Sequence, residues 1–345
     1  MLVYVAKRLL LMIPTLLGAV TLTFIIIQFV PGGPVEQLIA EMRQRQAGEV
    51  GGGTRGRRDL DAKQLADLKA LYGFDKPPVE RYFRMLKNFA KFDLGKSFRQ
   101  NKDVWQLIKE KLPVSASLGL WTFLLSYLIS VPLGIAKAVR EGSRFDVFTT
   151  FALLSGYAIP GFVLGVLLIV LFAGGTFVDW FPLRGLVSDN WRELSWPARI
   201  ADYLWHLTLP LICFAIGSFA TVTLLTKNTF IEEIRKQYVL VARAKGLSDR
   251  RVLYKHVFRN ALIPIVTGFP TAFVGAFFAG SLLIETLFSL DGLGLLSYES
   301  LLRRDYPVVL GTLYFFTLIA LFVKLVGDLL YVAVDRRVQF TAVAK

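Results

Sequence analysis

The sequence predicts an all-α membrane protein that crosses a bilayer about six times. Of its 345 residues, 54% are hydrophobic and 28 are Phe. These residues gather in separate blocks of about 20 residues or more, the length that a helix needs to cross roughly 30 Å of hydrocarbon. A soluble protein of this size could not bury so much apolar surface. We therefore expect a multi-pass protein that is surrounded by a lipid bilayer.

Six blocks are candidate spans. The first covers residues 9–30 and follows Lys7 and Arg8. It is longer than the core of a secretory signal and lacks a small-residue cleavage site, so we expect it to be retained. The other five are expected at 114–136, 146–172, 206–226, 263–285 and 308–332. Prolines in or beside these spans are tolerated where neighbouring helices satisfy the freed backbone groups.

The spans divide the chain into an N-terminal tail with the first span (1–30), a polar insertion (31–112) and a five-span core (113–345). Within the insertion, residues 48–58 are rich in glycine and predict a flexible linker. Helices are predicted over 60–72 and 79–89. We expect the insertion to be a small helical subdomain outside the membrane.

Basic residues predict the orientation in the membrane. The chain has 40 Lys and Arg against 26 Asp and Glu, a net charge of +14. The short loops on the side of the N-terminus, and the C-terminal tail, are much richer in Lys and Arg than the short loops on the other side, as is typical of cytoplasmic segments. Because topology explains these residues, no nucleic-acid partner is expected. Both termini are predicted to be cytoplasmic, and the insertion extracytoplasmic.

The long cytoplasmic loop, residues 227–262, has the most informative pattern. A helix is predicted over 229–245 and ends at Gly246, in the position that favours a left-handed cap. Ser248 is the predicted N-cap of a second helix, with Asp249 in its first turn. Small side chains at this bend would let another protein approach closely, which predicts a docking surface.

Several segments resemble one family of transport proteins. YVLVARAKGLSDRRVLYKHVFRNALIPIV (238–266) resembles the coupling loop of ABC-importer permeases of the dipeptide, oligopeptide and nickel family. Nearly the whole chain is similar, with landmarks at LSGYAIPGF (154–162), IETLFSLDGLGLL (284–296), RDYPVVLGT (304–312) and VDRRVQF (334–340). The resemblance implies a type I ABC importer permease fold. It also implies that an ATPase docks on Tyr238, Ala242, Arg243, Ala244, Lys245, Gly246, Leu247 and Ser248.

The same resemblance implies partners and a location. A second homologous permease, an ATPase with two nucleotide-binding domains and an extracytoplasmic peptide-binding protein are expected in a bacterial inner membrane. ATP and Mg would bind the ATPase, and this chain would bind no cofactor. FSLDGLG (288–294) and WFPLRGLVSDNW (180–191) are similar to a subgroup that takes up peptides and peptide–nucleotide antibiotics of the microcin C type.

Enzymatic and metal chemistry are not expected. Gly95-Lys96-Ser97 resembles part of a phosphate loop, but the glycine required five residues earlier is Ala90. We find no catalytic constellation. His206 and His256 lie far apart, and Cys213 is expected to be a small buried core residue, so no metal site is predicted.

Three polar residues lie within or at the ends of the spans. Lys324 and Asp328 share one face of the last span and form either a structural pair or a substrate contact that lines a cavity. Glu285 either contacts a binding protein or partner permease, or marks the interface with water. The alternative function is a secondary peptide transporter or channel that ATP does not drive. A secondary transporter would need ion-coupling residues in its spans, where Asp328 is nearly alone.

Overall fold

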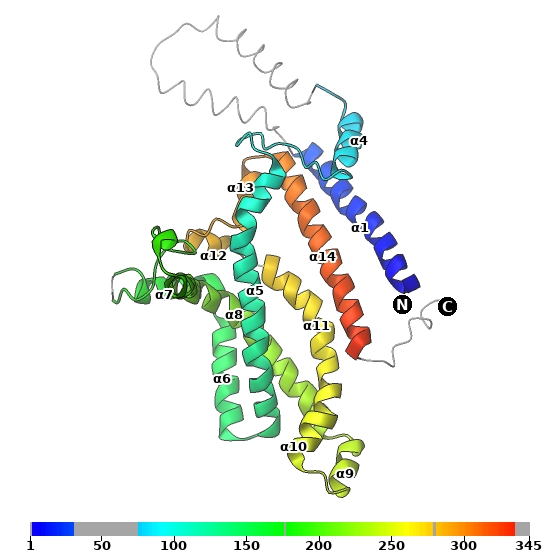
Figure 1. Ribbon diagram of the computed structural model, residues 1–345, viewed down its shortest axis with the longest axis vertical. Coiled ribbons are helices and arrows are strands. Elements are labelled where there is room, and N and C mark those ends of the chain that lie inside the picture. Colours follow the sequence, from blue (N-terminus) through cyan, green and yellow to red (C-terminus); the bar gives the residue numbers. More distant parts are fainter. Residues whose placement is uncertain (1, 31–74, 176, 279–280, 335–345) are drawn as a thin grey trace, which may run out of the picture. The chain divides into compact units, whose positions relative to one another are not determined.

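The structure is a computed structural model that describes residues 2–30, 75–175, 177–278 and 281–334 (Figure 1). All regular structure in these ranges is helical, apart from one isolated β-bridge between Lys96 and Asp103. The chain divides into two compact units, which we describe separately. The expected linker over 48–58 and the expected helix over 60–72 lie outside the described residues.

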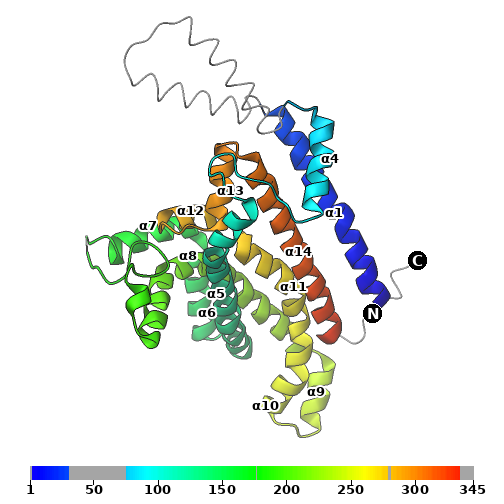
Figure 2. The ribbon, with the colours of Figure 1, turned by 45° about the horizontal axis from the view of Figure 1, so that its top comes forward.

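The smaller unit comprises residues 6–112 and 296–319. It contains nearly all of α1 (Leu2–Phe29), all of α4 (Pro78–Phe89) and the first residues of α5 (Val104–Val139). Most of α13 (Leu293–Leu302) and the first half of α14 (Tyr306–Val334) complete it. α4 begins with proline at its first position and confirms the helix expected over 79–89. α1 and α4 lie side by side (Figure 2), joined by a 2.7 Å hydrogen bond between Thr21 Oγ1 and Tyr82 Oη.

The segment after α4 is held by one acidic residue of the same unit. The Ser97 hydroxyl donates to Asp305 Oδ2 at 2.5 Å, and the Phe98 amide donates to Asp305 Oδ1 at 3.0 Å. Gly95 adopts a left-handed φ of 80° in this turn. The Gly-Lys-Ser tripeptide is thus part of a turn that its own chain anchors.

The larger unit comprises residues 1–5, 113–295 and 320–345. Beyond the main part of α5 it contains α6 (Arg144–Ala158), α7 (Gly161–Phe172), the short turn η1 (Trp191–Glu193) and α8 (Trp196–Ile234). There follow α9 (Gln237–Ala244), α10 (Asp249–Arg251), the π-helical turn η2 (Val252–Val257), α11 (Phe258–Phe278) and α12 (Ser281–Leu287). α8 is the central helix, because α6, α7 and α11 all pack against it.

Five described helices are long and apolar enough to cross a membrane: Tyr4–Phe29, Val104–Val139, Trp196–Ile234, Asp249–Gly275 and Tyr306–Leu330. The span expected over 146–172 is not one continuous helix. α6 and α7 meet at a bend of 95°, so six spans result only if this pair counts as one. The bend lies at Ile159, whose backbone is extended (φ −86°, ψ 119°) because the following Pro160 disfavours the helical region for it.

α5 and α8 approach closely along a seam of small and hydroxyl side chains. The Ser130 hydroxyl donates to the Phe219 carbonyl at 3.0 Å. A Cβ atom on Gly134 would lie 2.6 Å from the Cβ of Thr226, so only glycine fits at this point of the seam. Small residues and hydroxyl hydrogen bonds are typical of helix contacts inside membranes, where no hydrophobic effect drives helices together.

Candidate functional site

The predicted docking surface lies between α8 and α11. We call residues 235–257 the α8–α11 connection. α8 ends at Ile234 and the chain turns before α9 begins, so the single helix expected over 229–245 is broken. The turn lets Val239 pack in the same apolar cluster as Phe230. A straight helix would carry Val239 about 13 Å farther along its axis.

Gly246 ends α9 in the manner that the sequence predicts. Its φ is +78°, in the left-handed region. Its amide donates to the Arg243 carbonyl at 2.9 Å, and the Leu247 amide donates to the Ala242 carbonyl at 3.4 Å, the hydrogen bonds of a Schellman motif. A Cβ at Gly246 would meet nothing within 4 Å, so backbone conformation and not crowding requires glycine there.

The second helix begins where expected but continues differently. Ser248 is the N-cap of α10, although its side chain makes no capping hydrogen bond. Asp249 accepts a hydrogen bond from Arg243 Nε at 2.9 Å, which links the two sides of the turn. After one turn the helix widens into η2 before it becomes α11. Such π-helical turns are rare and occur often at functional sites.

One face of the connection packs against its own chain. Val239 is fully buried and Ala242 is 8% exposed, so Ala242 belongs to this inner face and not to the surface that the sequence analysis assigned to it. Both lie in a cluster with Phe230, Val252 and Val257. Tyr238 and Leu247 are half-buried. The Tyr238 hydroxyl donates to Glu233 Oε2 at 2.8 Å, and burial raises the pKa of Tyr238.

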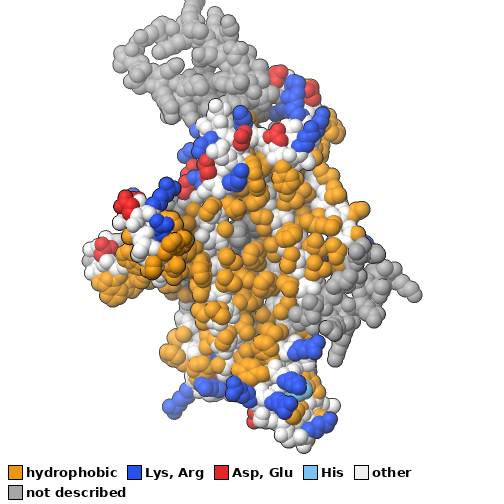
Figure 3. All heavy atoms as spheres, in the orientation of Figure 1, with side chains coloured by type: hydrophobic (Ala, Val, Ile, Leu, Met, Phe, Trp, Pro, Cys, Tyr) orange, Lys and Arg blue, Asp and Glu red, His pale blue; other side chains and the backbone are white. Residues whose placement is uncertain are grey.

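The other face is open. The remaining predicted docking residues are exposed: Arg243, Ala244, Lys245, Gly246 and Ser248. Three large apolar side chains of the connection are exposed as well, with fractions of 60% for Leu240, 53% for Val241 and 57% for Tyr254. Lys and Arg side chains gather around α9 and α10 (Figure 3). A segment that exposes both large apolar and basic side chains is typical of a protein-binding surface.

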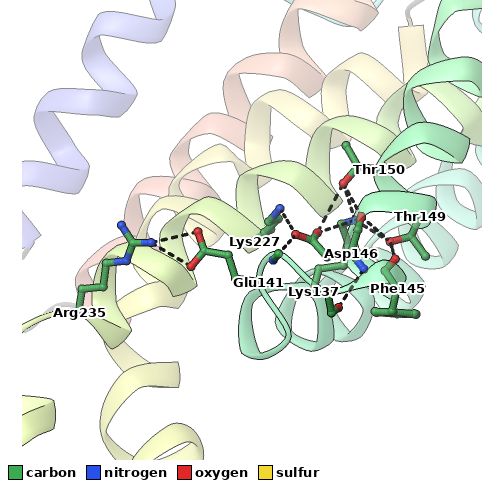
Figure 4. A network of polar contacts seen from close by, with 10 residues as sticks. Lys137, Glu141, Phe145, Asp146, Thr149, Thr150, Lys227 and Arg235 are labelled. Carbon is green, nitrogen blue, oxygen red and sulfur yellow. Dashed lines mark hydrogen bonds and ion pairs between the residues drawn. The ribbon is translucent and has the colours of Figure 1, made fainter.

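A buried ionic cluster braces the same end of the larger unit. Lys137, at the end of α5, is fully buried. Its Nζ donates to Thr149 Oγ1 at 2.6 Å, Thr150 Oγ1 at 2.8 Å and the Asp146 carbonyl at 2.8 Å, and lies 3.1 Å from Asp146 Oδ1 (Figure 4). Its three donors are thus matched by acceptors from α6, which satisfies a charge that would otherwise be costly to bury.

Asp146 joins α8 to this cluster. Lys227 Nζ donates to Asp146 Oδ2 at 2.7 Å, and the Gly142 amide donates to the same oxygen at 3.2 Å. We call Lys137, Asp146, Thr149, Thr150 and Lys227 the Lys137 network. Beside it, Arg235 Nη2 donates to both carboxylate oxygens of Glu141, at 3.0 Å to Oε1 and 2.9 Å to Oε2 (Figure 4). The ends of α5, α6 and α8 are therefore tied to the first residue of the α8–α11 connection.

This network was not predicted from the sequence, because Lys137 and Lys227 are among the basic residues on the side of the N-terminus that the orientation in the membrane already explains. One signal could have found it. Lys137 still belongs to an apolar helix, and Asp146 opens the next apolar helix nine residues later. Charges at that depth usually pair with each other.

Comparison with known proteins identifies the family. Residues 130–340 match the family described as binding-protein-dependent transport system inner membrane component. The chain belongs to this family. It is 54% identical, over 98% of both chains, to the peptidoglycan transport system permease protein YejB of Agrobacterium fabrum strain C58. It is 51% identical to the inner membrane ABC transporter permease protein YejB of Escherichia coli O157:H7, over 98% of both chains. The oligopeptide transport system permease protein AppB of Bacillus subtilis strain 168 is 33% identical, over 98% of this chain and 99% of AppB.

These relatives confirm the predicted family, and the subgroup that residues 180–191 and 288–294 resemble is that of the YejB permeases. The chain is a permease subunit of an ABC importer and not an enzyme, and it is a multi-pass protein of the inner membrane. Membership implies a separate ATPase subunit and a binding protein. It also excludes the alternative of a secondary transporter or channel.

Glu285 has neither of the roles expected for it. The permease buries this side chain completely, so it reaches neither water nor another subunit. Its Oε2 accepts the Leu295 amide at 2.8 Å, and the Ser115 hydroxyl lies 3.5 Å from its Oε1. Ser115 Oγ in turn accepts the Leu293 amide at 2.8 Å. Together the two side chains cap the N-terminus of α13, where negative charge is favoured.

A glycine makes this cap possible. A Cβ atom on Gly292 would lie 2.6 Å from the carboxyl carbon of Glu285 and 2.6 Å from Oε1. The carboxylate therefore sits against the backbone directly before α13. The Gly-Leu-Gly element of the sequence, residues 292–294, is therefore the segment whose backbone passes over the Glu285 carboxylate.

Lys324 and Asp328 do not form the pair that their spacing allows. Lys324 is exposed and Asp328 is half-buried on α14. No hydrogen bond or ion pair joins these two side chains, both of which are described. An assignment of either residue to a structural or substrate-binding role stays a prediction.

In the described ranges, no group of three or more His, Cys, Asp and Glu side chains is placed to hold a metal ion. Cys213 is 3% exposed within an apolar cluster, as expected of a small core residue. His206 is buried and its Nδ1 lies 2.8 Å from the Asp202 carbonyl in its own helix.

Proposed function

We propose that this permease imports peptides and that the open face of the α8–α11 connection docks its ATPase. The observation that carries the docking proposal is the exposure of Leu240, Val241 and Tyr254 in the same connection that exposes Ala244 and Gly246. The substrate class is supported by relatives whose names include oligopeptide, dipeptide and peptidoglycan transport. Muropeptides, the peptidoglycan fragments in which a short peptide is attached to an amino sugar, fit both the peptide and the peptidoglycan descriptions.

The contacts of the connection suggest how motion passes into the membrane. When ATP closes the nucleotide-binding domains, a docked ATPase would displace α9. The inner face of α9 packs on Phe230 of α8 and on Val257, which precedes α11, so a displacement of α9 would carry both helices with it. The Lys137 network would extend the movement to α5 and α6. The outcome is alternating access, in which binding energy shifts the balance between two conformations.

The remaining parts of the assembly are proposed from the same resemblance. A second homologous permease would complete the pathway, and an extracytoplasmic binding protein would deliver the peptide. ATP and Mg would bind the ATPase, with no cofactor on this chain. Both termini would be cytoplasmic.

The docking proposal is tested by a bulky substitution on the open face. Ala244→Trp should lower co-purification of the ATPase by about tenfold, because overpacking an interface costs about as much as overpacking a core. The amount of permease in the membrane should not change. Glu193→Trp adds the same side chain to an exposed position of the loop between α7 and α8 and is the matched control. Normal co-purification and normal uptake of a labelled muropeptide in Ala244→Trp would overturn the proposal.

The finer proposal is that the importer also takes up peptide–nucleotide antibiotics of the microcin C type. It rests on the subgroup resemblance of residues 180–191 and 288–294. A strain that lacks its own importer genes and therefore resists microcin C should become sensitive again when the whole importer is expressed in it. Restored muropeptide uptake without restored sensitivity would contradict this finer proposal and leave the peptide importer standing.

A further inference from the structure

The smaller unit contains a cavity that the transport function does not explain. Its volume is about 550 Å³. Its walls are α1, α4, the segment over residues 93–101 and the start of α14, all within one unit. It lies at the end of α1 that leads into the polar insertion.

The charged residues that line this cavity are mostly basic in the part of the chain that the structure describes. Among the described residues, Arg81, Arg84 and Lys96 line it, against the acidic Asp93, whose Oδ1 accepts the Gly95 amide at 3.0 Å. Arg84 also pairs with Glu80 at 3.2 Å, outside the lining. Arg81 Nη2 donates to Gln28 Oε1 at 2.7 Å, a contact between α4 and α1 at the wall of the cavity. An excess of Arg and Lys favours an anionic ligand, and guanidinium groups suit phosphate.

A second, apolar groove continues from the cavity. Its volume is about 370 Å³, and it shares Phe24 and Gln28 with the cavity. It runs between α1 and α4, and Thr21, Ile25, Phe29, Val79 and Tyr82 line it. Because α1 is a candidate span, this groove follows a helix that hydrocarbon surrounds.

α4 itself has the features of a helix that lies in a membrane interface. Val79 and Phe83 are 66% and 63% exposed at i, i+4 positions, which gives the helix an apolar edge. Glu80, Arg84 and Lys87 are exposed as well, so charged side chains flank this edge. Interfacial helices combine basic residues with Phe and aliphatic residues in this way.

We propose that the cavity and groove bind one anionic phospholipid. The phosphate would contact Arg81, Arg84 and Lys96, and one acyl chain would lie in the groove between α1 and α4. A lipid would occupy both the basic cavity and the apolar groove, whereas a free anion would occupy the cavity alone. The presence of the two side by side therefore favours a lipid. The orientation proposed above places this lipid in the outer leaflet of the inner membrane.

Native mass spectrometry of the assembled transporter tests the proposal. The wild type should retain phosphatidylglycerol in preference to zwitterionic phosphatidylethanolamine. Arg81→Gln with Arg84→Gln should lower phosphatidylglycerol binding by about fivefold for each cation removed. Lys96→Gln, at an exposed position, gives the same test in a variant with little risk to folding. Lys87→Gln is the control. It removes an exposed cation of α4 that does not line the cavity, so this variant should bind as much phosphatidylglycerol as the wild type does.

Three results would overturn the proposal. The first is equal retention of the two lipids by the wild type, and the second is unchanged binding in both Lys96→Gln and the double variant. The third is displacement of phosphatidylglycerol by inorganic phosphate, which would indicate a free-anion site. Muropeptide uptake is measured separately, so a failure of the transport proposal would not be mistaken for a failure of this one.

Discussion

The α8–α11 connection and the Lys137 network lie at the same end of the larger unit but place their side chains in opposite ways. The connection exposes more than half of the surface of Leu240, Val241 and Tyr254. The network buries Lys137 and Asp146 and satisfies them within the chain. Exposed apolar groups favour a partner, and satisfied buried charges fix the chain's own geometry. Loss of function and loss of stability should therefore separate between the two regions.

The largest effect on stability is expected in the network. Asp146→Leu would leave Lys137 buried without its counter-charge and should lower the free energy of unfolding by about 3 to 5 kcal/mol. Asp189→Leu is the matched control at an exposed position and should change it by less than about 0.5 kcal/mol. Thermal unfolding of the purified transporter measures both. Adding Lys137→Met to Asp146→Leu should restore part of the loss, and failure to do so would argue against an unpaired charge as the cause.

A smaller effect is expected at the second buried carboxylate. Glu285→Gln keeps the shape of the side chain but replaces a charge-assisted hydrogen bond to the Leu295 amide with a neutral one. The free energy of unfolding should fall by about 1 to 2 kcal/mol. Glu193→Gln, on the exposed turn η1, should have no measurable effect on the same assay. Equal stabilities of the two variants would contradict the capping role of Glu285.

In the α8–α11 connection, a substitution should lower function more than it lowers the stability of the protein. Gly246→Val places a β-branched residue at φ +78° and should strain the turn by about 1 to 2 kcal/mol. Because the turn carries the docking surface, uptake and ATPase co-purification should fall while the thermal stability of the spans stays close to the wild type. Gly246→Asn is the control, since Asn tolerates left-handed backbone, and it should keep most of the uptake. Similar uptake by both variants would show that conformation at this position does not matter.

The smallest effect is expected where the two regions meet. The Arg235–Glu141 pair is exposed, so Arg235→Gln should change the free energy of unfolding by less than about 1 kcal/mol. The difference should vanish at high salt, because exposed ion pairs are screened. A loss as large as that of Asp146→Leu would mean that the pair belongs to the buried network after all.

The sequence predicts the features that local chemistry determines. Apolar blocks gave the spans because only helices of that length satisfy their backbone in hydrocarbon. The cap at Gly246 was predictable because a left-handed residue ends a helix in the same way in any protein. The bend before Pro160 was not predicted, because the sequence indicated one span over 146–172 and the packing of α7 on α8 and α12 is not visible in it.

Features that depend on which residues meet in space were not predictable. Ala242 is small and adjacent to exposed residues, yet the turn after α8 places it inward. From the sequence, Glu285 was expected at a surface or interface. In the structure it is buried at the start of α13 beside Ser115, which lies 170 positions away in the sequence. In the sequence, Lys137 cannot be distinguished from an exposed cytoplasmic lysine. In the structure it is buried, and α6 provides the acceptors for its hydrogen bonds. In each case a distant segment decides the environment.

The contact between Gly292 and Glu285 has an evolutionary consequence. A side chain at position 292 cannot coexist with the full length of a glutamate at position 285, since even a Cβ would overlap the carboxyl group. Gly292→Ala should therefore be suppressed by the shorter Glu285→Asp, although neither change alone is tolerated well. In diverged sequences, a change at position 292 should therefore be accompanied by a change at position 285.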